Sequence, residues 1–395
     1  MTLTLTTHQE KALEDLLDLP GQVVALRGLA GTGKTSIIPE LTKRIEGAVV
    51  AAPTNRAAGI LRRKDLEAVT LHKACLRPYY TETFDSFASW VQNPNSQRMP
   101  TLLKKVPEDK AITLVNQCSN NLEKACIAFN VNPMDHVQGW TARDQDPQAC
   151  LIIDEASMVG SRMLAEALKT FDRIVLVGDP GQLRPIQDQS VLENAEGVEL
   201  TEIHRQALDS PIVQFAHAIR HAKPGEFVDP PEGIETSNRF DYERGPVIVY
   251  TNKTRHCLNS GIRRMRGLPE HELVVGEPLV CKATVKDWTS QGLVNNSLWT
   301  YEGDGFVRSE DGFKVFVDSM HVDGIDKDPP HFLDCQFQLG YAITAHTAQG
   351  SEWPSVQIYV NEVAAFEKQN GHEEAQKWLY TAVTRARESL TLVYT

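Results

Sequence analysis

A glycine-rich segment near the start of the chain has the residue types and spacing of a phosphate-binding loop. It fits the pattern GxxxxGK[ST], and the positions expected to face a nucleotide are Gly28, Ala30, Gly31, Thr32, Gly33, Lys34 and Thr35. Consecutive backbone N–H groups in such a loop, together with the positive end of a following helix, attract phosphate groups. We expect Lys34 to reach the terminal phosphates and Thr35 to ligate Mg²⁺.

The elements on either side of this segment are those that a phosphate-binding loop requires. The apolar run at residues 23–26 predicts a strand before it, and residues 36–45 have a helical pattern after it. A glycine-rich turn that matches the pattern by chance is therefore the weaker interpretation. Pro39 lies beyond the first turn of the expected helix, where its missing N–H predicts a kink or an early 3₁₀ turn.

Two further apolar strands end in side chains suited to nucleotide hydrolysis. The run at 151–153 is followed by Asp154 and Glu155, and a second strand is followed by a loop that contains Gln182. A carboxylate at a strand end can hold Mg²⁺, so we assign Asp154 to the metal and Glu155 to the base that polarises the attacking water. The neutral amide of Gln182 can sense whether a γ-phosphate is present.

Length and composition indicate a globular protein with several domains. The chain has 395 residues, of which 41% are hydrophobic and 23% are charged, and a chain of this length forms two or more domains. It contains no apolar run long enough to span a membrane, and its first residues lack the pattern of a signal peptide. We therefore expect a cytoplasmic protein, acting in the host cytoplasm if the source is viral.

Charge and cysteine content narrow the range of partners. The net charge of −12 argues against a uniformly basic surface for nucleic acid. Basic clusters at residues 62–64, 104–105 and 263–266 can still line a local channel, or they can be solvated helix faces. The seven cysteines are scattered without zinc-ligand spacing, so we expect reduced and mostly buried thiols.

Apolar strand patterns rich in β-branched residues alternate with helical patterns along most of the chain. They lie at residues 47–52, 151–154, 173–177, 247–250, 356–360 and 390–394. Nearly continuous apolar strands separated by helices indicate parallel sheets that are covered on both faces. A composition break near residues 223–231 divides the strands into two groups, so we expect two α/β domains in series.

Two segments interrupt this alternation. Residues 77–148 lack strong strand patterns and carry aromatic side chains that include Tyr79, Tyr80, Phe84, Phe87, Trp90 and Trp140. We interpret these aromatics as the small core of an inserted subdomain rather than as a base-stacking surface. At residues 276–334, alternating patterns punctuated by glycine predict short antiparallel strands, which we interpret as a small β-barrel inserted in the second domain.

The segments that carry the candidate catalytic side chains resemble motifs of superfamily 1 helicases. Residues 154–157 (DEAS) resemble motif II, and residues 178–185 (GDPGQLRP) resemble motif III, whose Gln contacts the terminal phosphate in that family. The other matches follow in the family's order and are residues 51–58 (motif Ia), 70–72 (Ib), 200–206 (IV), 343–352 (V) and 380–387 (VI). The Ala-Pro-Thr form of motif Ia and the His-Thr-Ala-Gln-Gly form of motif V resemble the RecD and phage Dda branch most.

The resemblance implies a role for each matched position. Arg205 and Arg385 would complete the nucleotide site from the facing side of a cleft, with Arg385 as an arginine finger. Gln9 stands where the family reads adenine, and Gly350 and Glu352 of motif V are expected at the nucleotide. The positions expected to contact single-stranded DNA are Pro53, Thr54, Asn55, Thr70, His72, Thr344 and His346.

The resemblance also implies a domain organisation of two RecA-like parallel-sheet domains in tandem, each with an inserted subdomain. The first domain would comprise residues 1–76 and 149–207, and its insertion, residues 77–148, is where relatives can carry a strand-separating pin. The second domain would comprise residues 208–275 and 335–395. Its insertion, residues 276–334, would be the small β-barrel.

These features favour an ATP-dependent DNA helicase that uses ATP and Mg²⁺ to move along single-stranded DNA and to separate a forked or tailed duplex. The resemblance implies movement in the 5′ to 3′ direction. We expect a monomer that has no membrane partner. Candidate protein partners are a single-stranded-DNA-binding protein and replication or recombination proteins. The alternative is a nucleic-acid-stimulated ATPase or translocase that displaces proteins or acts on RNA. A non-enzymatic nucleotide switch is disfavoured, because Glu155, Arg205 and Arg385 are all present.

Overall fold

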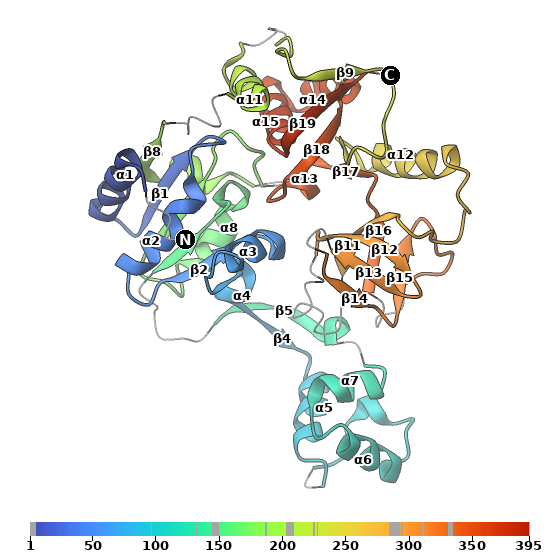
Figure 1. Cartoon of the computed structure of the whole chain (residues 1–395). Helices are drawn as coiled ribbons and strands as arrows, with labels where there is room; N and C mark the ends of the chain where they lie inside the picture. Colours follow the sequence, from blue (N-terminus) through green and yellow to red (C-terminus); the bar gives the residue numbers. More distant parts are fainter. Residues whose placement is uncertain are drawn as a thin grey trace. The chain divides into compact units, whose positions relative to one another are not determined.

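The computed structural model describes residues 5–95, 97–131, 133–143, 150–185, 188–202, 209–223, 226, 228–283, 293, 295–309, 312–330 and 335–394. The chain divides into two compact units, one formed by Met1–Ala74 with Gln145–Thr395 and the other by Cys75–Asp144. Within the described residues, the larger unit holds three sheets, and the smaller unit holds a two-stranded ribbon with helices (Figure 1).

The first sheet of the larger unit is parallel throughout, with the strand order β3-β2-β6-β7-β1-β8. Its strands are β1 (Val23–Gly28), β2 (Val49–Ala52), β3 (Ala68–Thr70), β6 (Leu151–Ile153), β7 (Ile174–Gly178) and β8 (Glu196–Leu200). The helices in this part of the chain are α1 (Thr7–Asp18), α2 (Lys34–Arg44), α3 (Asn55–Arg62), α4 (Leu71–Cys75), α8 (Ser161–Ala167) and α9 (Val191–Asn194), with the 3₁₀ turn η3 (Ala156–Met158). Every residue of β6 and β7 is buried, which is typical of a parallel sheet covered on both faces.

Helices α1 and α2 pack against β1 and so fix both ends of the glycine-rich loop. Buried side chains of α1 and α2, such as Leu13 and Ile37, share one hydrophobic cluster with Leu26 of β1. Burying each such side chain contributes roughly 1.5–3 kcal/mol, so the loop joins two firmly held elements. Helix α2 runs without interruption through Pro39, so the predicted early 3₁₀ turn is not found in this helix.

The second sheet is also parallel, with the strand order β17-β10-β18-β19-β9. Its strands are β9 (Glu235–Ser237), β10 (Val247–Val249), β17 (Ala342–Thr344), β18 (Trp353–Tyr359) and β19 (Ala386–Val393). The helices are α11 (Pro211–His221), α12 (Asn252–Met265), α13 (Ala345–Ala348), α14 (Val363–Asn370) and α15 (His372–Val383), with the 3₁₀ turn η5 (Val360–Glu362). Two parallel sheets in series confirm the predicted α/β class.

The third sheet accounts for the predicted β-rich insertion. Its strands are β11 (Pro278–Ala283), β12 (Leu298–Gly303), β13 (Phe306–Ser309), β14 (Lys314–Phe316), β15 (Met320–Asp323) and β16 (Cys335–Leu339), in the order β14-β13-β12-β11-β16-β15. All pairs are antiparallel except β15 with β16. Among the described residues no pairing joins β14 to β15, so the structure gives this insertion as a sheet and does not establish the predicted barrel.

The smaller unit combines an antiparallel ribbon with a helical cluster. Its elements are β4 (Leu76–Tyr80), α5 (Glu82–Gln92), η1 (Thr101–Leu103), α6 (Glu108–Gln117), α7 (Leu122–Ala128), η2 (Pro133–His136) and β5 (Val137–Ala142). Phe84, Phe87 and Trp90 of α5 are buried in one cluster, as predicted for an aromatic core. The same prediction is wrong for Tyr79 and Trp140 of the ribbon, which are 48% and 50% exposed.

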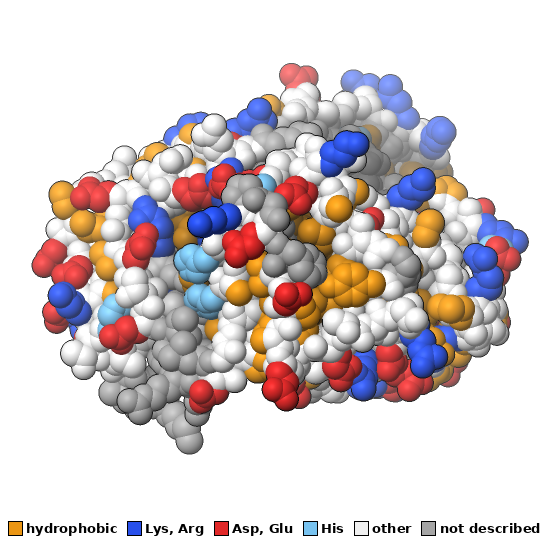
Figure 2. All heavy atoms as spheres, turned by 90° about the horizontal axis from the view of Figure 1, so that it is seen from above, with side chains coloured by type: hydrophobic (Ala, Val, Ile, Leu, Met, Phe, Trp, Pro, Cys, Tyr) orange, Lys and Arg blue, Asp and Glu red, His pale blue; other side chains and the backbone are white. Residues whose placement is uncertain are grey.

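The surface seen in Figure 2 carries both acidic and basic side chains and is not uniformly basic, as the net charge of the chain predicts. Among the side chains coloured in Figure 2, Lys and Arg are interspersed with Asp and Glu, and hydrophobic side chains gather near the centre of that face. The basic cluster at 263–266 is partly structural, because buried Arg263 pairs with Glu277 and Arg266 donates to Tyr341 Oη at 2.7 Å. No helix in the described part of the chain is long and apolar enough to cross a membrane.

The cysteines agree with the expectation of reduced thiols. All seven are free, and only Cys257 is exposed. Burial raises the pKa of the Cys126 and Cys150 thiols to about 11, which keeps both thiols protonated and unreactive near neutral pH. The cysteines therefore contribute packing rather than chemistry.

Candidate nucleotide and nucleic-acid site

The glycine-rich loop has the backbone conformation that phosphate binding requires. Gly31 and Gly33 have φ values of 82° and 76°, in the left-handed region that favours glycine. Gly33 is the N-cap of α2, so the unpaired N–H groups of the first turn of α2 face the loop. At Gly28 a Cβ atom would lie 2.5 Å from Thr32 Oγ1, so no side chain fits there. These features are those of a nest for anionic oxygen atoms.

Two predicted nucleotide residues make contacts inside this loop. Lys34 Nζ donates to the Leu29 carbonyl at 3.0 Å and lies 3.8 Å from Asp179 Oδ2. Gln9 Nε2 donates to the Thr32 carbonyl at 3.3 Å, which joins the start of α1 to the loop. The Lys34 side chain is 15% exposed, so its ammonium group is sheltered but still reachable from outside.

The two carboxylates after β6 are adjacent in the chain, with Asp154 buried and Glu155 half-buried. Glu155 has a left-handed backbone with φ 53°, and its N–H donates to Asp154 Oδ1 at 3.0 Å. Burial, followed by repulsion from Glu155, raises the pKa of Asp154 to about 7. Burial also raises the pKa of Glu155, while the charges of Arg385 and Lys34 lower it. Both carboxylates therefore lie within electrostatic reach of Lys34, and Glu155 also lies within reach of Arg385.

The two predicted Mg²⁺ ligands, Thr35 and Asp154, are of the chemical type that Mg²⁺ prefers. The carboxylate of Asp154 and the hydroxyl of Thr35 are hard oxygen ligands, and a cation beside Asp154 would offset the cost of its buried charge. Among the described residues, no cluster of three or more His, Cys, Asp or Glu side chains could hold a metal ion alone. A partial protein shell of this kind is typical of Mg²⁺ that is shared with substrate phosphates.

The loop after β7 holds a fully buried carboxylate beside the glycine-rich loop. Asp179 Oδ1 accepts from the Gly181 N–H at 2.8 Å, and Asp179 Oδ2 accepts from the Tyr380 hydroxyl at 2.8 Å. The Ala30 N–H in turn donates to Tyr380 Oη at 2.8 Å. Gln182 is buried nearby in the chain, and its Oε1 has no hydrogen-bond partner among the described residues. Such an orphaned amide oxygen is unusual and fits a group that acquires its partner from a ligand or water.

Uncharged groups of α15 and of the C-cap of α13, which belong to the second sheet's part of the chain, bind the same loop. The Leu183 N–H donates to Thr381 Oγ1 at 2.9 Å. The Leu183 carbonyl accepts from Gln349 Nε2 at 3.1 Å. The loop that follows β7 is therefore held on both sides of Leu183 by residues that belong to the second sheet.

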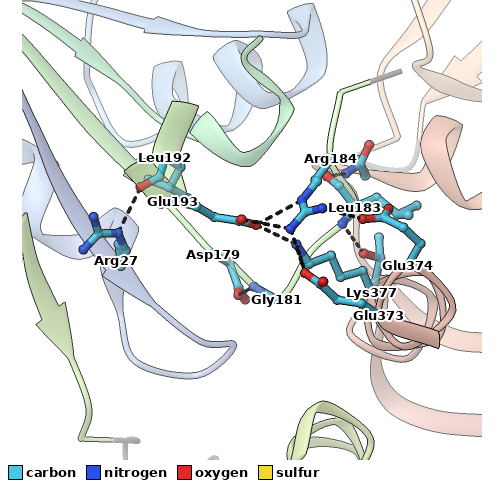
Figure 3. A network of polar contacts seen from close by, with 12 residues as sticks. Arg27, Asp179, Gly181, Leu183, Arg184, Leu192, Glu193, Glu373, Glu374 and Lys377 are labelled. Atoms are coloured by element: carbon cyan, nitrogen blue, oxygen red, sulfur yellow. Dashed lines mark hydrogen bonds and ion pairs between the residues drawn. The ribbon is translucent and has the colours of Figure 1, made fainter. Parts of the chain in front are cut away.

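A charged cluster extends this junction, as Figure 3 shows. Arg184 pairs with Glu193 of α9 at 2.9 Å and with Glu373 and Glu374 of α15 at 2.7 and 3.0 Å. Lys377 of α15 is buried and lies 2.6 Å from Glu193. The cluster joins charges from the first-sheet segment to charges on α15.

The predicted arginine finger is buried within the second sheet's own structure. Arg385 Nε donates to the Thr381 carbonyl at 2.9 Å, Nη1 to the Ser351 carbonyl at 3.0 Å, and Nη2 to Thr384 Oγ1 at 3.0 Å. These bonds fix the guanidinium, and its charge lowers the pKa of Glu155. The second predicted arginine, Arg205, lies outside the described residues.

Two motif V residues, Gly350 and Glu352, are placed by their contacts with α3 and by their effect on Glu155. Gly350 has a φ of 70°, and a Cβ atom there would lie 3.4 Å from Ala57 Cβ and 3.7 Å from Thr54 Oγ1. Glu352 is exposed, and its charge raises the pKa of Glu155. The segment thus lies against α3 at Gly350, and its Glu352 lies within electrostatic reach of the Glu155 carboxylate.

Two of the predicted DNA-binding threonines occupy equivalent places on the two parallel sheets. Thr54 caps α3 directly after β2, where its Oγ1 accepts from the Ala57 N–H at 3.1 Å. Thr344 is the last residue of β17 and caps α13, where its Oγ1 accepts from the Thr347 N–H at 3.3 Å. Each therefore lies at a helix N-terminus, which is a favourable place for a phosphate.

The remaining predicted DNA contacts are spread over the first and second sheets. Pro53 and Asn55 flank the α3 cap and are half-buried. Thr70 Oγ1 accepts from the Lys73 N–H at 3.3 Å, and His72 is exposed on α4. Burial lowers the pKa of His346, so its imidazole is neutral near neutral pH. Gly350 brings motif V beside Thr54, whereas no hydrogen bond among the described residues joins Thr70 or His72 to motif V.

Sequence reasoning did not assign several residues that join the two sheets. They are Asp179, Gln349, Tyr380 and Thr381. Each lies inside a segment that already matches a motif, so the motif was the only available signal. The hydrogen bonds that give them a role join positions far apart in the chain, and a linear pattern does not reveal such pairs.

Comparison with known families agrees with this geometry. Residues 4–236, more than half of the chain, match the family described as AAA domain, and residues 339–393 match the UvrD-like helicase C-terminal domain. The ATP-dependent RecD2 DNA helicase of Deinococcus radiodurans is 28% identical over 274 residues, which make up 61% of this chain and 36% of that protein. The chain thus spans little more than a third of that relative.

Solved structures share the fold over nearly the whole chain. A structure that concerns DNA unwinding at forked double-stranded DNA by two Pif1 helicases has a TM-score of 0.56 at 20% identity, covering 98% of this chain and 92% of the other. Bacteroides Pif1 bound to single-stranded DNA has a TM-score of 0.55 at 18% identity, with the same coverage. The predicted fold of two tandem RecA-like domains is confirmed. The chain belongs to the AAA domain family, and its C-terminal part is similar to the UvrD-like helicase C-terminal domain.

Proposed function

We propose that this chain hydrolyses ATP and uses the energy to move along single-stranded DNA and to separate a forked or tailed duplex. The observation that best supports the proposal is the hydrogen-bonded path from the glycine-rich loop to α15. It runs from the Ala30 N–H to the Tyr380 hydroxyl and on to Asp179 of the loop after β7. A change at the phosphates would reach the second RecA-like domain along this path.

The proposed nucleotide site lies mainly in the first domain. The loop N–H groups and Lys34 would hold the phosphates, and Thr35 and Asp154 would hold Mg²⁺. When bound, Mg²⁺ would neutralise part of the phosphate charge. Glu155 would take a proton from the attacking water, and the charges of Lys34 and Arg385 favour the ionised form that this role needs.

The second domain would complete the site during hydrolysis. Arg385 of the second domain would stabilise the charge that develops on the transferring phosphoryl group, and Arg205, which the proposed bounds place in the first domain, would assist it. Gln182 would respond to the terminal phosphate, which agrees with its buried amide oxygen, for which the described part of the chain offers no hydrogen-bond partner. Gly350 and Glu352 would border the nucleotide, and Gln9 would lie at the adenine.

The proposed DNA path uses the helix N-termini of both domains. Thr54 and Thr344 would bind successive phosphates at the starts of α3 and α13. The other proposed contacts are Pro53, Asn55, Thr70, His72 and His346. Movement of the two domains relative to each other would then shift the DNA contacts of one domain along the strand. We propose that the chain moves in the 5′ to 3′ direction.

We propose that the inserted segments assist strand separation. The segment 77–148 would act as the strand-separating subdomain, because its ribbon exposes the aromatic rings of Tyr79 and Trp140, which can stack on bases. The proposed first domain comprises residues 1–76 and 149–207, and the second comprises 208–275 and 335–395 with the insertion 276–334. We further propose a monomer that acts in the cytoplasm, with DNA-processing proteins as partners.

Duplexes that carry a single-stranded tail at either the 5′ or the 3′ end test the proposal. With ATP and Mg²⁺, we expect the chain to separate the 5′-tailed duplex and to leave the 3′-tailed and blunt duplexes intact. Separation of only the 3′-tailed duplex would reverse the direction. ATP hydrolysis without separation of any duplex would contradict the helicase proposal and favour a translocase that displaces proteins, and stimulation by RNA alone would favour an RNA substrate.

A further inference from the structure

A buried tyrosine from the second domain is hydrogen-bonded inside the glycine-rich loop of the first. Tyr380 is fully buried on α15, and its hydroxyl accepts from the Ala30 N–H and donates to Asp179 Oδ2, both at 2.8 Å. Its ring edge also limits the space at Gly181, where a Cβ atom would lie 3.1 Å from Tyr380 Cε1. The position of the hydroxyl is therefore set by contacts on several sides.

The hydrogen bonds of Asp179 account for both of its oxygen atoms. Oδ1 accepts from the Gly181 N–H, and Oδ2 accepts from the Tyr380 hydroxyl. Lys34 Nζ lies 3.8 Å from Oδ2, which is too long for a direct hydrogen bond, and donates instead to the Leu29 carbonyl. Asp179 is thus satisfied without drawing the Lys34 ammonium into a tight ion pair.

Removing the Tyr380 hydroxyl would change this balance. Asp179 Oδ2 would be left buried without a donor, and an unsatisfied buried carboxylate is costly. The ammonium of Lys34 is the cation that ion-pairs with Oδ2, and a shift of about an ångström would give it a short, charge-assisted bond. Lys34 would then be held by Asp179 and would be less available to phosphate.

We propose that Tyr380 is a positioning residue of the nucleotide site, whose hydroxyl satisfies Asp179 and so leaves Lys34 available for phosphate. The inference rests on the proposed function, because it takes Lys34 to bind the phosphates of ATP. It also means that the position of α15 affects how available Lys34 is to the nucleotide. If α15 moved away from the first domain, Asp179 would lose the hydroxyl and would attract Lys34, which would weaken the hold on the nucleotide.

The test compares nucleotide binding by the Tyr380→Phe variant and the wild-type chain. We expect the dissociation constant for ATPγS to rise about tenfold, while that for AMP, which lacks the phosphates assigned to Lys34, stays within about twofold. Tyr394→Phe is the matched control, because this tyrosine is 40% exposed in the second domain and lies outside the nucleotide site. Thermal melting of each variant establishes that the fold is intact.

A double-mutant cycle with Asp179→Asn isolates the mechanism. Neutralising the carboxylate removes the pull on Lys34, so Tyr380→Phe should weaken ATPγS binding by less than about twofold in that background. An equal tenfold loss in both backgrounds, or unchanged ATPγS binding by Tyr380→Phe alone, would overturn the inference. If Tyr380→Phe does not fold, Asp179→Asn alone still decides, because the inference expects unchanged or tighter ATPγS binding and a clear loss would contradict it.

These binding measurements do not depend on hydrolysis. A wild-type chain that binds ATPγS but does not hydrolyse ATP would refute the proposed function, and the cycle would still test Tyr380. Conversely, normal DNA-stimulated hydrolysis by the wild type, together with additive losses in the cycle, would refute only the role of Tyr380.

Discussion

The two parallel sheets differ in the kind of group that they bring to the candidate nucleotide site. In the first sheet, β1 ends in a loop whose left-handed glycines turn backbone N–H groups toward a common point. The second sheet offers side chains instead, with Tyr380 on α15 and Arg385 just before β19. Backbone groups are fixed by the fold, whereas side chains on a second domain move with that domain. The difference agrees with the proposed function, in which the first sheet binds the nucleotide and the second sheet responds to it.

The sheets are alike where DNA contact is proposed. Thr54, after β2, and Thr344, the last residue of β17, both cap a short helix by accepting from the N–H group three residues on. A translocating protein needs two similar grips that alternate, but only one nucleotide site between them. Both sheets carry a helix-capping threonine, whereas the glycine-rich loop belongs to the first sheet, and this arrangement fits that requirement.

The largest expected effect is that of Lys34→Ala, which removes the cation from the first sheet's loop. ATP turnover should fall by about 10³-fold or more, and ATPγS binding should also weaken. The reason is that Lys34 is proposed to contact the phosphates both in the bound ground state and in the transition state of hydrolysis. A phosphate-release assay and an equilibrium binding assay measure the two quantities. Lys43→Ala, on the exposed face of the same helix, is the control and should leave both unchanged.

Arg385→Ala tests the contribution of the second sheet. DNA-stimulated turnover should fall by about 10³-fold, while ATPγS binding changes by less than about threefold, because an arginine finger acts mainly on the transition state. Arg387, two residues on and exposed, provides the control Arg387→Ala. A loss of nucleotide binding as large as the loss of turnover would mean that both sheets hold the ground-state nucleotide.

Glu155→Gln separates binding from chemistry within the first sheet. The amide cannot accept the proton of the attacking water, so turnover should fall by about 10²- to 10³-fold while ATPγS still binds. Glu166→Gln on α8, a surface carboxylate that pairs with Lys169, is the matched control. Turnover that survives in Glu155→Gln would assign the base to another residue.

The smallest effect is expected at the charged junction of Figure 3. Arg184→Ala removes ion pairs to Glu193, Glu373 and Glu374, but Arg184 is 32% exposed and solvent screens such pairs. DNA-stimulated turnover should change by only about two- to threefold, and its dependence on salt should become shallower. Arg244→Ala, which removes pairs inside the second domain, should not alter the salt dependence.

Much of the fold and the nucleotide site could be predicted because the signals are local. The glycines at 31 and 33, the lysine after them and the buried strand before Asp154 lie within a few residues of the structure they specify. Strand β8 (Glu196–Leu200) was not predicted, because it is an edge strand in which polar residues interrupt the apolar pattern. Short edge strands depend on pairing with a distant neighbour more than on their own sequence.

The junction between the sheets could not be predicted for a related reason. The Tyr380 hydroxyl and Asp179 are 201 positions apart, and both are buried polar groups whose partners are fixed only when the two domains meet. The basic cluster at 263–266 was ambiguous in the sequence because a solvated helix face and a local nucleic-acid channel use the same residue types, and neither alternative anticipates a buried ion pair. Arg263 resolved as a structural group because Glu277 lies beside it in the fold.

The most direct test of the split site is the ratio of ATP turnover with and without single-stranded DNA, measured for the wild-type chain and for Arg385→Ala. The account predicts a rate that rises about tenfold or more with DNA in the wild type and a ratio close to one in the variant, because stimulation requires the second sheet to complete the site. Stimulation that is absent in the wild type, or that persists undiminished in Arg385→Ala, would contradict it.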